Sequence, residues 1–313
     1  MIMKKIQLTI GSLLLLSIGL VQAQQAATYA QYMFNTLAIN PAYAGSQDAL
    51  SLSFLGRFQN VGLTGAPNTQ TFTAHTPLLN ERIGVGMLFI RDNVSVINQS
   101  GVHFSYAYRL PLNNRKATLS FGVQAGASIY DAQYTQLDLF NNPFTDGVDP
   151  AFAENIRASK PNFGAGVYYA NQKSYIGLSM PSLASNVFDR GKNLTTVYQS
   201  VPMILTAGHV FTLSRVLKWK PNFLFKMVDW QPVEFDINNT LLFDEVLWLG
   251  MSVKSSGELV MLTQFKINDQ LQAGYTYSLN GGRARTLALG SHEFMISYRF
   301  LYNKKGVISP RYF

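Results

Sequence analysis

Apolar and polar side chains alternate one by one through much of the chain. The alternation is clearest in two segments, at Val102, Phe104, Tyr106, Tyr108 and Leu110 and again at Leu119, Phe121, Val123, Ala125, Ala127 and Ile129. A period of two residues predicts strands with one apolar and one polar face. Each segment is about ten residues long, the length that a tilted strand needs to cross an outer membrane. The pattern therefore favours a barrel with lipid outside and a polar lumen.

Segments of this kind predict about fourteen strands. They lie near 49–58, 69–77, 82–91, 101–110, 117–129, 162–170, 173–180, 202–213, 219–227, 234–243, 246–254, 258–267, 270–279 and 291–302. The expected fold is all-β, a transmembrane antiparallel up-and-down β-barrel. A soluble β-sandwich would also give short alternating strands, but so many large aromatic positions would leave it with exposed apolar surface.

The predicted connections alternate in length along the chain. The gaps at 78–81, 111–116, 171–172, 214–218, 244–245 and 268–269 are short, whereas most of those between them are longer, at 59–68, 92–100, 130–161, 181–201 and 280–290. Outer-membrane barrels have short periplasmic turns and longer outer loops. The alternation of short and long connections therefore predicts that both chain termini lie in the periplasm. The short outer gap at 255–257 is the exception to the pattern.

The amino-terminal residues have the pattern of a secretory signal peptide. Lys4 and Lys5 precede an apolar run of about 16 residues, which ends at a small-residue cleavage pattern, and a membrane-spanning helix would need about 20. This disfavours the alternative of a single membrane anchor. We expect a signal peptide at 1–23, a periplasmic or plug segment at 24–48, the barrel at 49–302 and a periplasmic tail at 303–313.

Composition supports lipid as the solvent of the apolar face. Only 13% of the residues are charged, against about 25% in soluble domains, and the chain has no cysteine. The formal net charge of +8 comes from basic residues scattered over strand ends and loops. We therefore expect contacts with outer-membrane lipid and lipopolysaccharide, and no nucleic-acid binding.

The search for catalytic chemistry finds no convincing motif. The four histidines fall on separate predicted strands without partners at metal-ligand spacing, at His75, His103, His209 and His292. Gly164 and Gly166 lack the lysine, the Ser/Thr and the following helix of a phosphate loop, and no G-x-S-x-G motif occurs. We expect neither a metal nor a cofactor, and a function other than catalysis.

The stretch before the first strand is unusually apolar for a periplasmic tail. It runs from Gln31 to Gly45 and reads QYMFNTLAINPAYAG. Physically it fits a buried plug or lid at the barrel mouth, turned by Pro41 and Gly45, or else a docking strip for a partner. Together with Gly65-Ala66-Pro67, Lys160 to Tyr169 and Gly290 to Phe300, this string resembles the PorP/SprF family of outer-membrane proteins. That family is associated with the type IX secretion and gliding apparatus of Bacteroidota.

The resemblance implies a barrel in the bacterial outer membrane that retains an exported partner at the cell surface or assists its secretion. The implied partners are a surface protein or adhesin with a type IX C-terminal domain and other components of the apparatus. This chain has Gln59 and Asn60 where the family usually has Gln-Trp, so its first outer loop departs from the family pattern. The residues that we expect to bind a partner are Gln31, Tyr32, Phe34, Asn40, Pro41, Tyr43, Gly65, Pro67, Asp138, Asp146 and Asp149.

Two readings of the loops and lumen stay open at this point. The long loops 130–161 and 181–201 are expected to grip the partner, and the first is acidic, yet loops of this kind can also merely shield the barrel mouth. A channel or transporter is the competing class, because a barrel of this width is not filled by its own side chains. Polar inward positions fit a wet lumen, as at Ser105, Arg109, Ser120, Gln124 and Ser128.

Overall fold

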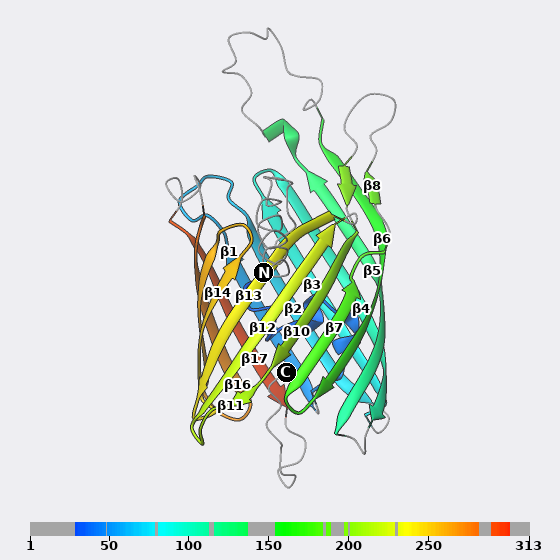
Figure 1. The fold of residues 1–313 in the computed structure, drawn as a ribbon. Helices are drawn as coiled ribbons and strands as arrows, with labels where there is room; N and C mark the ends of the chain where they lie inside the picture. The colour runs from blue at the N-terminus through cyan, green and yellow to red at the C-terminus, as the bar shows by residue number, and fades with distance from the viewer. Residues whose placement is uncertain are drawn as a thin grey trace, which may run out of the picture.

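One antiparallel sheet curls round and closes on itself (Figure 1). The computed structural model describes residues 29–47, 49–78, 81–112, 116–136, 154–183, 186–188, 197–199, 201–228, 231–281 and 289–300. Strand β1 pairs with β17 on one side of the barrel and β10 pairs with β12 on the other, and these pairings complete a ring of 14 strands. Within the described ranges, no helix has the length and hydropathy of a membrane span.

The strands of the ring follow the predicted order. They are β1 Leu50–Phe58, β2 Asn68–Leu78, β3 Ile83–Val94, β4 Ile97–Leu112, β5 Ala117–Ala132, β6 Ile156–Asn171, β7 Ser174–Met180, β10 Pro202–His209, β12 Leu217–Val228, β13 Gln231–Phe243, β14 Leu247–Lys254, β15 Leu259–Lys266, β16 Leu271–Leu279 and β17 Ser291–Phe300. The short β11 Phe211–Thr212 continues β10 along β12. Strands β8 Asn186–Phe188 and β9 Val197–Gln199 pair antiparallel in a separate two-stranded sheet. The predicted fold class and strand number are confirmed.

The alternation of side chains sorts the two faces of the sheet as predicted. In β4, Val102, Phe104 and Tyr106 are exposed on the outside, whereas His103 and Ser105 between them are buried in the lumen. The same contrast recurs around the ring, for example at Met251 outside and Ser252 inside. An exposed apolar band that surrounds a polar interior is stable only when lipid covers the outside.

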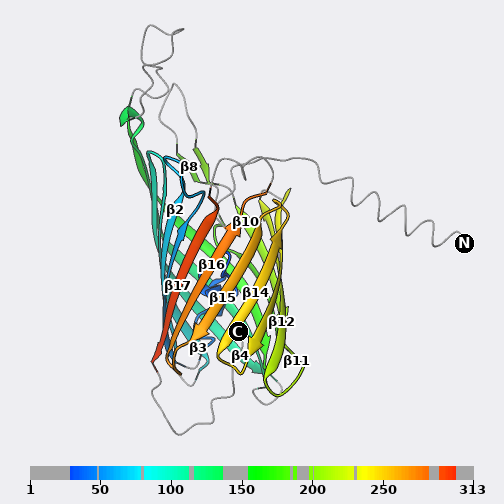
Figure 2. The same ribbon diagram turned by 90° about the vertical axis from the view of Figure 1, so that its left-hand side faces the viewer.

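Strands β3 to β6 extend further at one end than the sequence pattern indicated. The segment 92–100, predicted as an outer loop, instead extends β3 and β4 up to a turn at Ser95 and Val96. Strand β6 begins at Ile156 rather than near 162, and β4, β5 and β6 each have 16 residues in one continuous register. The end of the barrel that carries these extensions and the long connections is called the outer rim here, and the opposite end the periplasmic rim (Figures 1 and 2).

The segment 29–46, which we call the plug, lies inside the barrel. It contains two short 3-10 helices, η1 Thr36–Ala38 and η2 Pro41–Tyr43, and η2 packs against β4, β5 and β6. Figure 2 shows this dark blue segment behind β15, β16 and β17. The plug reaches well beyond the periplasmic mouth where the sequence placed it, because its first residues contact the wall near the outer rim. The predicted signal peptide 1–23 and the tail 303–313 lie outside the described residues.

Candidate functional site

Six of the predicted partner-binding residues lie in the plug. Gln31, Tyr32, Asn40, Pro41 and Tyr43 are buried, and Phe34 is half-buried. All six face the lumen wall or the rest of the plug, so in this conformation their visible role is to fill the bore. Binding of a partner by these residues stays a prediction.

The outer end of the plug is held by one carboxylate of the wall. Glu293, near the start of β17, accepts hydrogen bonds from the backbone N–H groups of Ala30 at 3.1 Å and Gln31 at 2.8 Å. The hydroxyl of Tyr29 lies 2.6 Å from Oγ1 of Thr71 in β2. Hydrogen bonds between a carboxylate and backbone N–H groups are about twice as strong as neutral ones, so Glu293 acts as a clamp on the plug.

A buried network of ion pairs surrounds this clamp. Arg57 lies 3.6 Å from Glu293 and 3.5 Å from Glu258, and Lys254 lies 3.2 Å from Glu258 and 3.9 Å from Glu234. Glu258 belongs to the turn between β14 and β15. Burial would raise the pKa of this carboxyl group, but the positive charges of Lys254 and Arg57 outweigh burial and leave the pKa below its ordinary value. The network therefore keeps the carboxyl group of Glu258 ionised.

The middle of the plug packs on an aromatic and cationic part of the wall. The ring of Phe34 meets Trp248 edge to face at 5.7 Å, and Nζ of Lys220 lies 5.4 Å from the centroid of each ring. Close by, Thr73 Oγ1 donates a hydrogen bond to Asn35 Oδ1 at 2.8 Å. Edge-to-face rings and a cation above them each contribute about 0.5–1.5 kcal/mol beyond their buried area.

The periplasmic half of the plug is held by hydrogen bonds from side chains of the plug and of the barrel wall. Asn40 caps η2 by accepting from the N–H of Ala42 at 2.9 Å, and its amide donates to the carbonyl of Val167 in β6 at 3.1 Å. Ser179 in β7 donates to the carbonyl of Ile39 at 2.7 Å. On the opposite wall, Nδ1 of His75 accepts from the N–H of Gly45 at 3.2 Å.

Inward-facing glycines make room for the plug along the wall. A Cβ at Gly84, Gly122, Gly166 or Gly274 would come closer than 3.0 Å to plug atoms, which belong to Ala44, to Pro41 and Ala42, to Asn40 and to Gln31 respectively. Glycine inside a strand can simply relieve crowding in a curved sheet. The structure shows a more specific reason, which is close approach of another backbone or side chain.

Replacing Asn40 with alanine should loosen the periplasmic half of the plug. The variant loses the cap of η2 and leaves the carbonyl of Val167 without this donor, so we expect the barrel to lose about 1–3 kcal/mol of unfolding free energy. Urea unfolding in detergent micelles, followed by the heat-dependent shift on SDS gels, measures the loss. Alanine at the exposed Gln99 in the outer part of β4 is the control and should leave the midpoint unchanged.

Two further predicted residues lie on the outer rim, in the loop 59–67. Gly65 has φ +75°, a left-handed conformation, and its carbonyl accepts from the N–H of Ser95 at 3.0 Å. The carbonyl of Pro67 accepts from the N–H of Gln59 at 2.9 Å. Both residues thus shape this loop, and the exposed Gly65 is at the surface that a partner could reach.

The base of the longest loop has a small apolar core of its own. Tyr130, Ala132, Tyr134 and Ile156 are all buried there, and the hydroxyls of the two tyrosines lie 3.1 Å apart. A 3-10 turn, η3 Tyr134–Gln136, continues β5, and Thr135 contacts Asn155 across the base of the loop. The three predicted acidic residues of this loop, Asp138, Asp146 and Asp149, lie outside the described residues.

The remaining chemistry-bearing groups have structural partners. His209 Nδ1 lies 2.7 Å from Ser174 Oγ, and His292 Nδ1 lies 2.8 Å from the hydroxyl of Tyr275. Across the part of the chain that the structure describes, no group of three His, Asp or Glu residues is placed to hold a metal ion.

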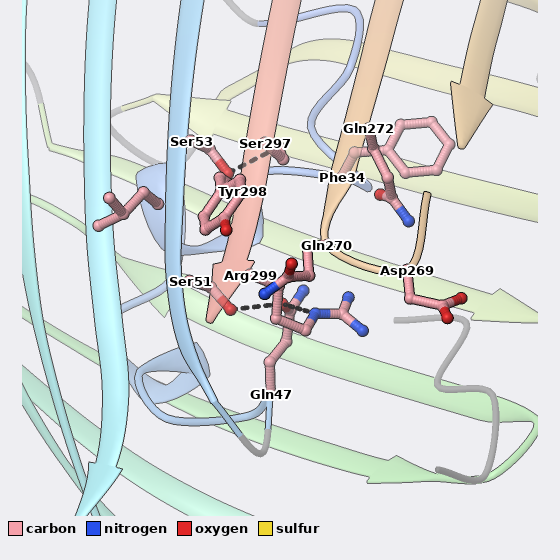
Figure 3. A pocket seen from close by; sticks show the side chains of 11 residues that line it. Phe34, Gln47, Ser51, Ser53, Asp269, Gln270, Gln272, Ser297, Tyr298 and Arg299 are labelled. Atoms are coloured by element: carbon pink, nitrogen blue, oxygen red, sulfur yellow. Dashed lines mark hydrogen bonds between the residues drawn. The ribbon is translucent and has the colours of Figure 1, made fainter. Parts of the chain in front are cut away.

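A small polar cavity opens near the periplasmic rim, between β1, β16, β17 and the plug (Figure 3). Gln47 is one of the lining residues, and its Oε1 accepts from Ser51 Oγ at 2.6 Å and from Arg299 Nε at 3.1 Å. The cavity measures about 30 Å³, which is room for one or two water molecules. Pockets that hold organic ligands are about ten times larger.

Comparison with known proteins finds one matching protein family and several solved structures of β-barrels with a similar fold. A family model described as type IX secretion system membrane protein PorP/SprF matches residues 21–298. No curated protein matches the chain.

Among solved structures, the chain resembles a FadL homologue from Pseudomonas aeruginosa, with 11% identity, a TM-score of 0.48 and coverage of 86% of this chain and 94% of that one. It also resembles Omp33 of Acinetobacter baumannii, with 10% identity, a TM-score of 0.44 and coverage of 82% and 100%. The KdgM porin is 7% identical, with a TM-score of 0.39 and coverage of 80% of this chain and 99% of that one. Likenesses this distant carry no argument about function.

Proposed function

Because the chain belongs to the PorP/SprF family of type IX secretion system membrane proteins, we propose that it is a non-enzymatic barrel whose outer loops hold an exported partner protein at the cell surface or assist its secretion. The barrel lies in the bacterial outer membrane. The proposed partner is a surface protein or adhesin with a type IX C-terminal domain, alongside other components of the secretion apparatus. Lipid and lipopolysaccharide are proposed to contact the outward face.

The observation that carries this proposal is the rigid support under the longest outer loop. A strand crosses the apolar band with about ten residues, so the 16 residues of β4, β5 and β6 leave about six that project above the outer rim. Figure 1 shows β5 and β6 rising at this place. The buried cluster of Tyr130, Ala132, Tyr134 and Ile156 stiffens the projection. Loops on a rigid support are the usual means of building a binding surface.

Charge indicates the kind of partner surface that would fit. Asp131 and Glu154 flank the loop, and Asp138, Asp146 and Asp149 lie within its sequence. Complementary charge raises the association rate and selects among partners more than it raises affinity. A basic face on the exported protein is therefore the proposed counterpart.

Replacing residues 138–153 with a short Gly-Ser linker tests the proposal. The replacement leaves Tyr134 and Ile156 in place, so the base of the loop and the barrel should fold normally. We expect the exported partner to move from the cell surface to the medium and to disappear from pull-downs of detergent-solubilised outer membrane read by mass spectrometry.

The control for this experiment keeps the length of the loop and removes its charge. Asparagine at Asp138, Asp146 and Asp149 should weaken retention most at low ionic strength, since exposed charges are screened by salt. Unchanged surface retention in the linker variant, with a folded barrel, would refute the assignment and favour loops that only shield the mouth.

A further inference from the structure

We propose that the plug seals the lumen, so that the barrel passes neither ions nor small solutes. This inference does not rest on the proposed function, because it concerns the interior of the barrel rather than its loops. It also argues against the channel that the polar inward residues left open.

The plug touches the wall around much of its circumference. Its hydrogen bonds and ring contacts reach β2, β6, β7, β14 and β17, through Thr71, Val167, Ser179, Trp248 and Glu293. The inward glycines add close contacts on β3, β5 and β16. Lys220 on β12 faces Phe34. These contacts reach nine of the fourteen strands, and from them we infer that no continuous open path remains beside the plug.

The plug also fills the bore along most of its length. Its outer end contacts Thr71 and Glu293 near the outer rim, and its other end lies against Pro77 and Gly84 near the periplasmic rim. Gln31, Tyr32 and Ala42 are 0% exposed and Leu37 is 1% exposed. Side chains this inaccessible have no water beside them, and a conducting bore needs a continuous column of water.

The seal consists of specific contacts between plug and wall rather than of nonspecific packing. A barrel of this size without a plug has a lumen too wide for its own side chains to fill. Here the wall carries glycine where the plug backbone approaches and carries the polar or aromatic partners Glu293, Ser179 and Trp248 where the plug presents matching groups. Wall and plug are thus complementary at these contacts.

The decisive measurement is single-channel conductance of the full-length protein in planar bilayers. The native protein should be silent, and a steady porin-like conductance would overturn the inference. A variant with alanine at Tyr29, Phe34 and Asn40 releases the plug but leaves every wall residue intact, so its barrel should fold and conduct. If this variant is folded, has lost protection of the plug from added protease, and is still silent, the plug is not the seal.

A disulfide between plug and wall tests where the plug lies in the native membrane. The chain has no cysteine, and a Cβ at Gly86 would lie 3.4 Å from that of Ala44, close to disulfide geometry. The double variant A44C/G86C should therefore cross-link in cells and change mobility on non-reducing gels. A44C paired with cysteine at the lipid-facing Phe104 is the control that should not cross-link. Absence of the Ala44–Gly86 cross-link in a folded barrel would also overturn the inference.

Discussion

Replacing Glu293 with alanine is expected to cost about 3–5 kcal/mol of unfolding free energy and to open the outer end of the plug. The side chain is 2% exposed and serves two backbone donors and Arg57 together. Its removal leaves the charge of Arg57 buried with less compensation and leaves the N–H groups of Ala30 and Gln31 without their acceptor. Urea unfolding in micelles measures the stability, and planar-bilayer recording should show intermittent conductance.

Glutamine at the same position separates charge from shape. It keeps one carbonyl oxygen for a plug N–H but removes the charge that faces Arg57, so we expect a smaller loss of about 1–3 kcal/mol. An ion pair at the exposed periplasmic turn provides the surface control. Lys266 and Asp269 lie 2.8 Å apart there, and Asp269→Asn should change neither stability nor conductance. If E293A is as stable as the native protein, Glu293 is no clamp.

The second large effect is expected from Gly122→Ala in β5. A Cβ at this position would come closer than 3.0 Å to the backbone of Pro41 and Ala42, and a backbone cannot turn aside as a flexible side chain can. Overpacking of this kind costs about 1–3 kcal/mol. Because the plug is held less strongly than the wall, the strain should push the plug out and produce conductance.

Gly56→Ala in β1 is the matched control for this substitution. A Cβ there would meet only the rings of Phe58 and Phe54, at 3.8 and 3.9 Å, which is ordinary contact. This variant should remain silent and keep the native unfolding midpoint. Equal behaviour of the two alanine variants would mean that the wall adjusts around Gly122 without disturbing the plug.

The strands could be predicted from the sequence because lipid imposes a strict rule on them. Every second residue of a strand such as β4 must be apolar, and this periodicity is visible without any knowledge of neighbours. Strand ends above the membrane escape the rule. Asn98, Gln99 and Asp131 belong to β4 and β5, but their polarity made these ends resemble loops.

The contacts of the plug could not be predicted in the same way. The apolar composition of this segment indicated burial, but it fitted a plug inside the barrel and a docking strip for a partner equally well. The clamp joins Ala30 to Glu293 across 263 residues of sequence, and a single glutamate in a strand gives no sign of its partner. The available signal was glycine at inward positions, as at Gly122 and Gly166, since a wall that encloses only water has little need of glycine there.

The position of Glu293 has a consequence for biogenesis. It lies on the last strand of the barrel, opposite Arg57 of the first strand, where the two ends of the sheet join. The outer end of the plug can therefore be bound by Glu293 only when the carboxy-terminal strand is in place. Binding of the plug and pairing of β1 with β17 therefore become a single late event in folding. Steps that join distant parts of the chain in this way are slow. In a half-assembled sheet the plug would lack its contact with Glu293. An unbound plug is open to proteolysis, so quality-control proteases could recognise an unfinished barrel by it.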